Sequence, residues 1–162
     1  MQAAGLAEIK RELKTKDQEE LIQLCLRLGR FKKDNKELLT YLLYEMKDED
    51  GYISSIKAYI DEAMAGISTH SLYSATKSLR KVLRYATKMI RYSGNKQTEV
   101  EVLLHFCQSI NTSAYELKRS VVVTRIYERQ LAKIRQALKK LHEDLQADYR
   151  YELERLTGEG AF

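Results

Sequence analysis

The most informative absence in this chain is proline, which does not occur among its 162 residues. Proline breaks helices because it lacks a backbone donor, so a chain without it sets no such limit on helix length. Glycine, which also weakens helices, occurs only 7 times, and tryptophan does not occur. Leucine, lysine, glutamate and arginine greatly outnumber valine, threonine and phenylalanine, which favour strands. We therefore predict an all-α protein.

Long apolar runs are missing as well. No stretch reaches the roughly 18 residues that a membrane-spanning helix needs. The segment 1–14 carries charges at helical spacing without a continuous apolar stretch, so we expect no signal peptide. The two cysteines, Cys25 and Cys107, lie far apart and form no C-x-x-C pattern. This usage fits a reducing compartment, and we expect a cytoplasmic protein in which both cysteines are buried.

Helical spacing of apolar residues continues along the whole chain. With a hydrophobic fraction of 44%, it predicts a single all-helical domain over 1–162. We expect seven or eight helices: short ones over about 6–67, and longer ones over about 72–92, 98–110 and 114–156. Their layout is either a helical-repeat-like stack (an α-α superhelix) or an irregular bundle with a long C-terminal helix, although no repeat of fixed period is present.

Local signals refine the first half of this prediction. Asp17 and Glu20 have the spacing of a capping box, which starts a helix. Apolar residues then recur on one face, and we expect them to form a buried stripe: Leu21, Leu24, Cys25 and Leu28. The dipeptide Asp50-Gly51 predicts a turn between the next two helices.

A stricter pattern lies within 114–156, which we expect to be one protruding helix or two helices separated by a kink. Six apolar residues step by 4, 3, 4, 3 and 4, the spacing of a heptad seam: Tyr127, Leu131, Ile134, Leu138, Leu141 and Leu145. The seam has two interpretations. It is a spine on which shorter helices pack, or a dimerisation seam on which two copies pair antiparallel, the basic part of one beside the acidic part of the other.

The sequence shows no recognisable catalytic or metal motif. His142-Glu143 begins like a zinc-protease motif, but no second histidine follows at the required position. Glu101 and His105 are four residues apart, whereas the di-iron motif needs three. Glycines do not cluster into a phosphate-binding loop. We therefore expect a protein that is not an enzyme and that has no metal site, cofactor or evident small-molecule ligand.

Charge is distributed unevenly. The segment 64–98 has seven basic and no acidic residues, and 118–140 has eight basic and one acidic residue. Cations recur at helical spacing in both. The first basic line comprises Lys77, Lys81, Arg84, Lys88 and Arg91, and Arg80 widens it. The second basic line comprises Arg125, Arg129, Lys133 and Lys140. Three interpretations of these lines remain open: solvated or internally paired helix faces, surfaces that bind nucleic acid, and surfaces that bind an acidic protein or a membrane.

Three stretches near the start carry a family resemblance: Ile9-Lys10-Arg11-Glu12-Leu13, Gln18-Glu19-Glu20-Leu21-Ile22, and the segment from Asn35 to Leu43, NKELLTYLL. They resemble an uncharacterised bacterial family of small all-helical proteins, a domain of unknown function. The resemblance covers roughly residues 9–43. It implies a bacterial cytoplasmic protein with stacked helices, and it assigns no activity and no catalytic residues.

These features support three hypotheses, in order of preference. The first is a non-enzymatic protein–protein interaction or scaffold module, acting by self-association or with another protein, which predicts an exposed apolar groove or dimer seam. The second is a nucleic-acid-binding accessory protein, in which the two basic lines converge on one open face. The third is an enzyme with a scattered site, which predicts a pocket where an acidic residue meets histidine or tyrosine with a perturbed pKa.

Overall fold

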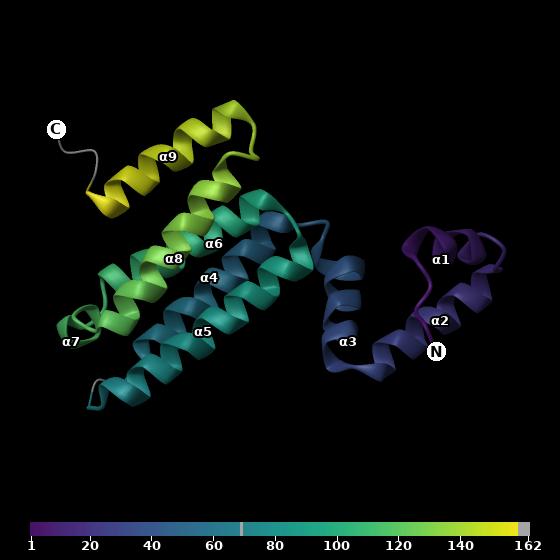
Figure 1. Ribbon diagram of the computed structural model, residues 1–162, viewed down its shortest axis with the longest axis horizontal. Helices are drawn as coiled ribbons and strands as arrows, with labels where there is room; N and C mark the ends of the chain where they lie inside the picture. Colours follow the sequence, from purple (N-terminus) through teal and green to yellow (C-terminus); the bar gives the residue numbers. More distant parts are fainter. Residues whose placement is uncertain (69, 159–162) are drawn as a thin grey trace. The chain divides into compact units, whose positions relative to one another are not determined.

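The computed structural model describes residues 1–68 and 70–158, and every regular element in those ranges is a helix (Figure 1). The all-α prediction is thereby confirmed. In chain order, the elements are α1 (Leu6–Leu13), α2 (Gln18–Phe31), α3 (Lys33–Thr40), a π-helical turn η1 (Tyr41–Glu45), α4 (Glu49–Ala65), α5 (Leu72–Ser93), α6 (Lys96–Asn111), α7 (Tyr115–Lys118), α8 (Val121–Leu138) and α9 (Glu143–Thr157).

Contacts divide the chain into two compact units, Met1–Tyr44 and Glu45–Phe162. We call them the N-terminal unit and the C-terminal unit. The prediction of a single domain over 1–162 is that the whole chain unfolds in one cooperative step, and an unfolding experiment would test it.

In the N-terminal unit, α2 packs on α3. The predicted capping box starts α2: the Glu20 N–H donates to Asp17 Oδ1 at 2.8 Å, and the Asp17 N–H donates to Glu20 Oε2 at 3.0 Å. Where the two helices meet, a Cβ added at Gly29 would lie 3.1 Å from Leu39 Cδ1, so the missing side chain permits this approach.

The predicted buried stripe of α2 is wrong. Leu24, Cys25 and Leu28 are exposed and Leu21 is only half-buried. In fact no residue of α1, α2 or α3 is buried. These residues stay exposed because α2 contacts α3 along one side only, and an apolar face becomes buried only when other helices cover it.

The C-terminal unit is built around α6, which contacts α4, α5, α7, α8 and α9. Figure 1 shows α4, α5, α6 and α8 running alongside one another. Most of the circumference of α6 is buried, through residues that include Val100, Val102, Leu103 and Phe106, as expected of a helix packed against several others. Asp48 caps α4 by accepting the Gly51 N–H at 3.0 Å, so Asp50-Gly51 lies in the first turn of α4 rather than in the predicted turn.

Of the two alternatives for 114–156, the single long helix is wrong, because the chain there forms α7, α8 and α9. The alternative of two helices separated by a break describes α8 and α9, which the short helix α7 precedes. After α8, the N–H groups of Lys140 and Leu141 donate to the carbonyls of Ala137 and Leu138, both at 3.0 Å, which closes a tight turn. His142 then caps α9. No proline or glycine marks this break, so the sequence pattern ran through it.

The six seam residues nevertheless share one environment. Leu131, Ile134 and Leu138 are buried in a core cluster with α6 and α9 residues, and Tyr127, Leu141 and Leu145 pack against that cluster. These six residues therefore pack helices together within the chain, and the dimerisation interpretation of the seam stays a prediction.

Candidate nucleic-acid interface

The first basic line lies on the outer face of α5. This helix starts where Ser71 accepts the Ser74 N–H, and it ends at Gly94, whose φ of 66° favours glycine. Its inner face buries Ala75, Leu79, Val82 and Ala86. On the opposite side Lys77, Lys81, Arg84 and Arg91 are exposed. Lys88 is half-buried, with its ammonium 5.9 Å from the centroid of the Tyr92 ring.

The second basic line follows α8 in the same way. The inner face of α8 includes Val123, Ile126 and Ile134, all buried. Arg125, Arg129 and Lys133 are exposed on the helix. Lys140 is exposed too, but it lies in the turn after α8 rather than on the helix.

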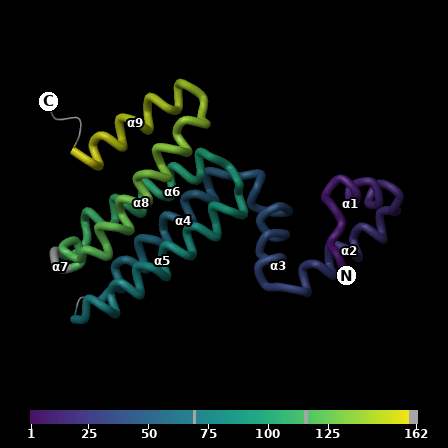
Figure 2. The backbone as a smooth tube through the Cα atoms, in the orientation of Figure 1, coloured from purple at the N-terminus to yellow at the C-terminus, as the bar shows by residue number. Residues whose placement is uncertain are grey.

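A groove of about 440 Å³ joins the two helices near their first turns. Figure 2 shows that α5 and α8 both start at the end of the C-terminal unit where α7 lies. The groove is lined on α5 by Leu72, Tyr73, Thr76, Lys77, Arg80 and Arg84, and at the beginning of α8 by Ser120 and Val122. Three cations therefore border one hollow.

Helical spacing connects the second basic line to the same groove. Arg125 and Arg129 follow Val122 by three and seven residues, which places all three on one side of α8. Because Val122 faces the groove, the second basic line continues from its edge. The two basic lines thus border a common face. We call the two lines together with Arg80 the basic face.

The groove also contains exposed apolar and aromatic surface. Tyr73 is 83% exposed, and Leu72 and Val122 are exposed beside it. Sequence reasoning placed Tyr73 on the helix but missed Val122 as a groove residue. A signal was present: Val121, Val122 and Val123 form an apolar run, although one helix face needs only one of them in the core, and only Val123 is buried.

Most of these cations form no ion pair with any acidic side chain that the structure describes. Among the side chains of residues 1–68, 70–114 and 117–158, no ion pair involves Lys77, Arg80, Lys81, Arg84 or Arg91, nor Arg125, Arg129, Lys133 or Lys140. Like charges spaced at i, i+4 repel, so an external polyanion would stabilise this face.

A second polar site joins α4, α6 and α9. Glu101 Oε2 accepts from Lys57 Nζ at 2.7 Å, and Oε1 accepts from Tyr149 Oη at 2.7 Å and Gln97 Nε2 at 3.1 Å. Burial alone would raise the pKa of Glu101, but these three hydrogen bonds and the Lys57 charge outweigh it and lower the pKa. Burial, and then the Glu101 carboxylate, raise the pKa of Tyr149.

Because the pKa of Glu101 is lowered and that of Tyr149 is raised, these two groups are not suited to exchange a proton with each other. A carboxylate held ionised beside a phenol held protonated transfers no proton near neutral pH. Tyr149 is itself buried. The arrangement instead ties three helices together through one carboxylate.

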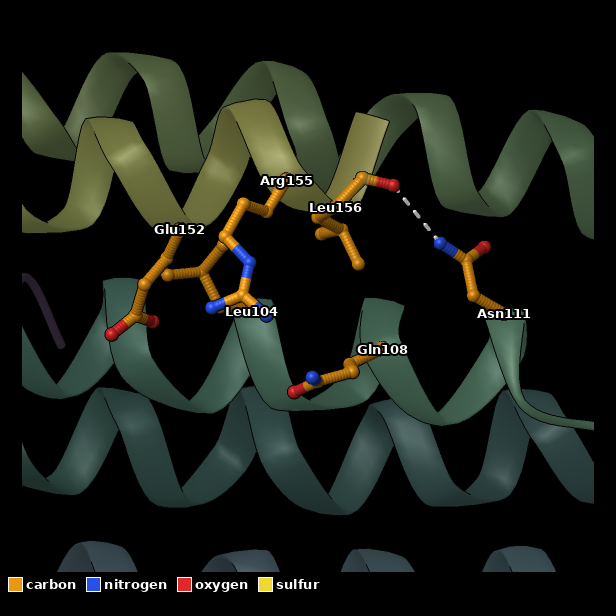
Figure 3. A pocket seen from close by; sticks show the side chains of 6 residues that line it. All are labelled: Leu104, Gln108, Asn111, Glu152, Arg155 and Leu156. Carbon is orange, nitrogen blue, oxygen red and sulfur yellow. Dashed lines mark hydrogen bonds between the residues drawn. The ribbon is translucent and has the colours of Figure 1, made fainter. Parts of the chain in front are cut away.

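A polar pocket of about 480 Å³ lies between α6 and α9 (Figure 3). Its lining comprises Leu104, Gln108, Asn111, Glu152, Arg155 and Leu156. Asn111 Nδ2 donates to the Leu156 carbonyl at 3.1 Å, the bond drawn in Figure 3, and to Tyr127 Oη at 3.1 Å. The lining includes the acidic residue Glu152 but neither a histidine nor a tyrosine.

Comparison with family models, curated proteins and solved structures finds no match for this chain. The resemblance of residues 9–43 to a bacterial family of unknown function therefore stays a prediction. Among the residues described, no helix combines the length and apolar character needed to cross a membrane. Nor do three or more His, Cys, Asp or Glu side chains there gather in a way that would hold a metal ion.

Proposed function

We propose that this chain is a non-enzymatic nucleic-acid-binding protein that uses the basic face of its C-terminal unit. The observation that carries the proposal is the groove between α5 and α8: it is lined by three α5 cations, Lys77, Arg80 and Arg84, and the second basic line continues from its far wall along the side of α8 that bears Val122. Convergence of the two lines is the feature expected of a nucleic-acid binder, and it moves this hypothesis ahead of the protein-interaction module that the sequence favoured.

The dimensions of the basic face suit a polymer. Lys77 and Arg91 are 14 residues apart, which is about 21 Å along a helix. That length matches about six phosphates of one strand at roughly 3.4 Å each. A cation recurs every three or four residues, or about every 5 Å, so the protein charges repeat on a scale comparable with the phosphates. An acidic protein segment rarely carries charges at such regular intervals.

The test is binding of labelled oligonucleotides, followed by fluorescence anisotropy at low and moderate salt. If about five phosphates are contacted, affinity for a single strand falls about 100-fold between about 50 and 200 mM salt. One variant removes the cations of the groove: Lys77→Gln, Arg80→Gln and Arg84→Gln. A second removes those of α8: Arg125→Gln, Arg129→Gln and Lys133→Gln. Each is expected to weaken binding by about 100-fold at low salt.

A matched control removes three exposed cations from α1 with Lys10→Gln, Arg11→Gln and Lys14→Gln. It changes net charge equally and is expected to leave the affinity within about threefold of wild type, because these three cations belong to neither basic line and exposed charges outside a binding site are screened by salt. Equal losses in all three variants would mean that net charge alone attracts the polymer, and the absence of binding at low salt would refute the proposal.

A second candidate function, self-association, is favoured by a different observation. Leu24, Leu28 and Phe31 form an exposed apolar hollow along α2, with Arg27 and Arg30 beside them. The first turn of α2 is acidic, with Glu19 and Glu20, and its last part is basic. An antiparallel second copy of α2 would place each acidic end beside a basic end while covering both hollows. A second copy of this chain is therefore the partner that the charges favour.

Sedimentation at several protein concentrations tests this second candidate. Leu28→Glu is expected to abolish a dimer, whereas Leu6→Glu, the same change on α1, is expected to preserve it. A wild-type chain that sediments as a monomer at the highest concentration would refute self-association.

A further inference from the structure

We infer that the groove between α5 and α8 binds an unpaired segment of nucleic acid, with a base stacked on Tyr73. The inference rests on the proposed function and names the class of nucleic acid that the site takes.

Cations and apolar surface lie in separate parts of the groove. Lys77, Arg80 and Arg84 occupy positions further along α5, whereas Leu72 and Tyr73 form its first turn. Val122 closes the opposite wall at the start of α8. A single strand of nucleic acid also has two chemically different parts, the charged phosphates and the flat apolar faces of the bases. The groove therefore offers each part of the strand a surface of matching chemistry.

The exposure of Tyr73 is what distinguishes a single strand from a duplex. At 83% exposed, its ring lacks the packing that normally covers a large aromatic side chain. Bases in a duplex are already stacked and present only their edges, so an aromatic face gains little from them. An unpaired base stacks on such a ring, and this stacking tolerates any base because every base has a π face.

A mononucleotide would fill the groove but leave most of the basic face empty. Arg91 on α5, and Arg129 and Lys133 on α8, continue beyond the residues that line the groove. Because the cations extend past the hollow, a ligand with several phosphates gains contacts that a single nucleotide lacks. We therefore expect a single-stranded oligonucleotide to bind at least about 100-fold more tightly than a mononucleotide.

The experiment compares the full chain with Tyr73→Ala and Tyr73→Phe, using single-stranded DNA, single-stranded RNA and a DNA duplex of one sequence. Loss of one stacked base is expected to weaken single-strand binding by about 5- to 150-fold in Tyr73→Ala, with recovery in Tyr73→Phe. Duplex affinity is expected to stay unchanged. A 2-aminopurine base in the single strand reports stacking directly, through fluorescence quenching that Tyr73→Ala removes.

Tyr151→Ala is the matched control. Tyr151 is an exposed tyrosine whose ring centroid lies 5.8 Å from the Arg155 guanidinium, but it sits on the acid-rich helix α9. Its removal is expected to change nothing in these assays. The comparison therefore separates a tyrosine that stacks on a base from one that is merely exposed beside a cation.

Different outcomes separate the inference from the proposed function. If the duplex binds as tightly as the single strand and Tyr73→Ala has no effect, the inference fails. In that case, loss of binding in the groove-cation variant still upholds the proposed function. If no oligonucleotide binds at low salt, both fail. A preference between DNA and RNA single strands identifies which of the two the groove accepts, and either preference supports the inference.

Discussion

The two units of this protein use similar helices in different ways. In the N-terminal unit, α1, α2 and α3 are amphipathic yet contain no buried residue. In the C-terminal unit, α6 contacts five other helices and is buried over most of its circumference. The comparison teaches that amphipathic spacing predicts where a helix has an apolar face, while the number of elements packed against that face decides whether it becomes core.

The two proposed functions follow the same contrast. The C-terminal unit covers most of its apolar side chains, and its outer faces carry the basic face proposed to bind nucleic acid. The N-terminal unit leaves apolar side chains exposed, and the proposed self-association uses them. Four predictions test this division, beginning with the largest effect.

A matched pair of phenylalanines gives the strongest test. Phe106 on α6 is 0% exposed, and Phe31 at the end of α2 is 76% exposed. Phe106→Ala is expected to lower the free energy of unfolding by about 3–5 kcal/mol, because it leaves a cavity in the core. Phe31→Ala is expected to cost less than about 0.5 kcal/mol. Urea unfolding at low protein concentration, followed by circular dichroism, measures both. Similar losses in the two variants would mean that Phe31 is as important to folding as a residue of the C-terminal core. A single unfolding transition would support one cooperative domain over the whole chain.

The two cysteines form a second matched pair. Cys25 is exposed on α2, whereas Cys107 is buried on α6, where burial raises the pKa of its thiol to about 12. Since the thiolate is the reactive form, we expect Cys107 to react with an alkylating reagent at least about 100-fold more slowly than Cys25. Mass spectrometry after timed labelling, native and in urea, distinguishes the sites. Equally fast labelling in the native chain would show that the C-terminal core opens readily.

A third test removes the carboxylate that ties α4, α6 and α9. Glu101→Gln is expected to lower the free energy of unfolding at pH 7 by about 1–2 kcal/mol, because Lys57 and Tyr149 lose a charged acceptor. Glu12→Gln, which removes an exposed pair with Lys16 in the N-terminal unit, is expected to cost less than about 0.5 kcal/mol.

Acid adds a second readout to that test. The folded state lowers the pKa of Glu101 below its ordinary value of about 4.5, so the contribution of Glu101 to stability is fully present above that pH. The contribution is lost as the pH falls through the lowered pKa. The difference in stability between wild type and Glu101→Gln should therefore shrink below about pH 4.5. A difference that stays constant down to low pH would show that Glu101 acts through packing rather than charge.

The smallest expected effect has the opposite sign. Gln130 on α8 is buried, and its Nε2 donates to the Ile126 carbonyl of its own helix at 3.1 Å. Its Oε1 accepts no hydrogen bond from any residue that the structure describes. Gln130→Leu is expected to stabilise the C-terminal unit by about 1 kcal/mol, since a buried acceptor without a partner is unfavourable. Gln136→Leu, an exposed change on the same helix, is expected to be neutral. Destabilisation by Gln130→Leu would show that the oxygen has a partner in solution.

Several local features could be predicted because neighbouring residues decide them. The capping box of Asp17 and Glu20 forms as its spacing predicts, since both partners lie within one turn. Cys107 is buried and Cys25 is not, although the sequence predicted burial for both. Each lies on an apolar helix face, but only the face on α6 is covered by other helices.

The candidate site divides in the same way. The cations of the basic face on α5 and α8 were identified from helical spacing, because spacing fixes which side of a helix a residue occupies; Lys140, in the turn after α8, is the exception. The groove was not identified, since it depends on α5 and α8 starting at one end of the bundle and on the break between α7 and α8, which places Ser120 and Val122 at its wall.

The sequence by itself thus determined the helical class, the apolar and basic faces of the helices, and the cap that starts α2, because these follow from residues within a few turns of one another. Only the tertiary structure decided which apolar faces are covered and which two basic lines share a groove. Those outcomes depend on contacts between residues far apart in the chain, and the heptad seam shows why: its spacing fits a dimer and a core equally well, and only the packing of α8 and α9 around α6 makes it a core.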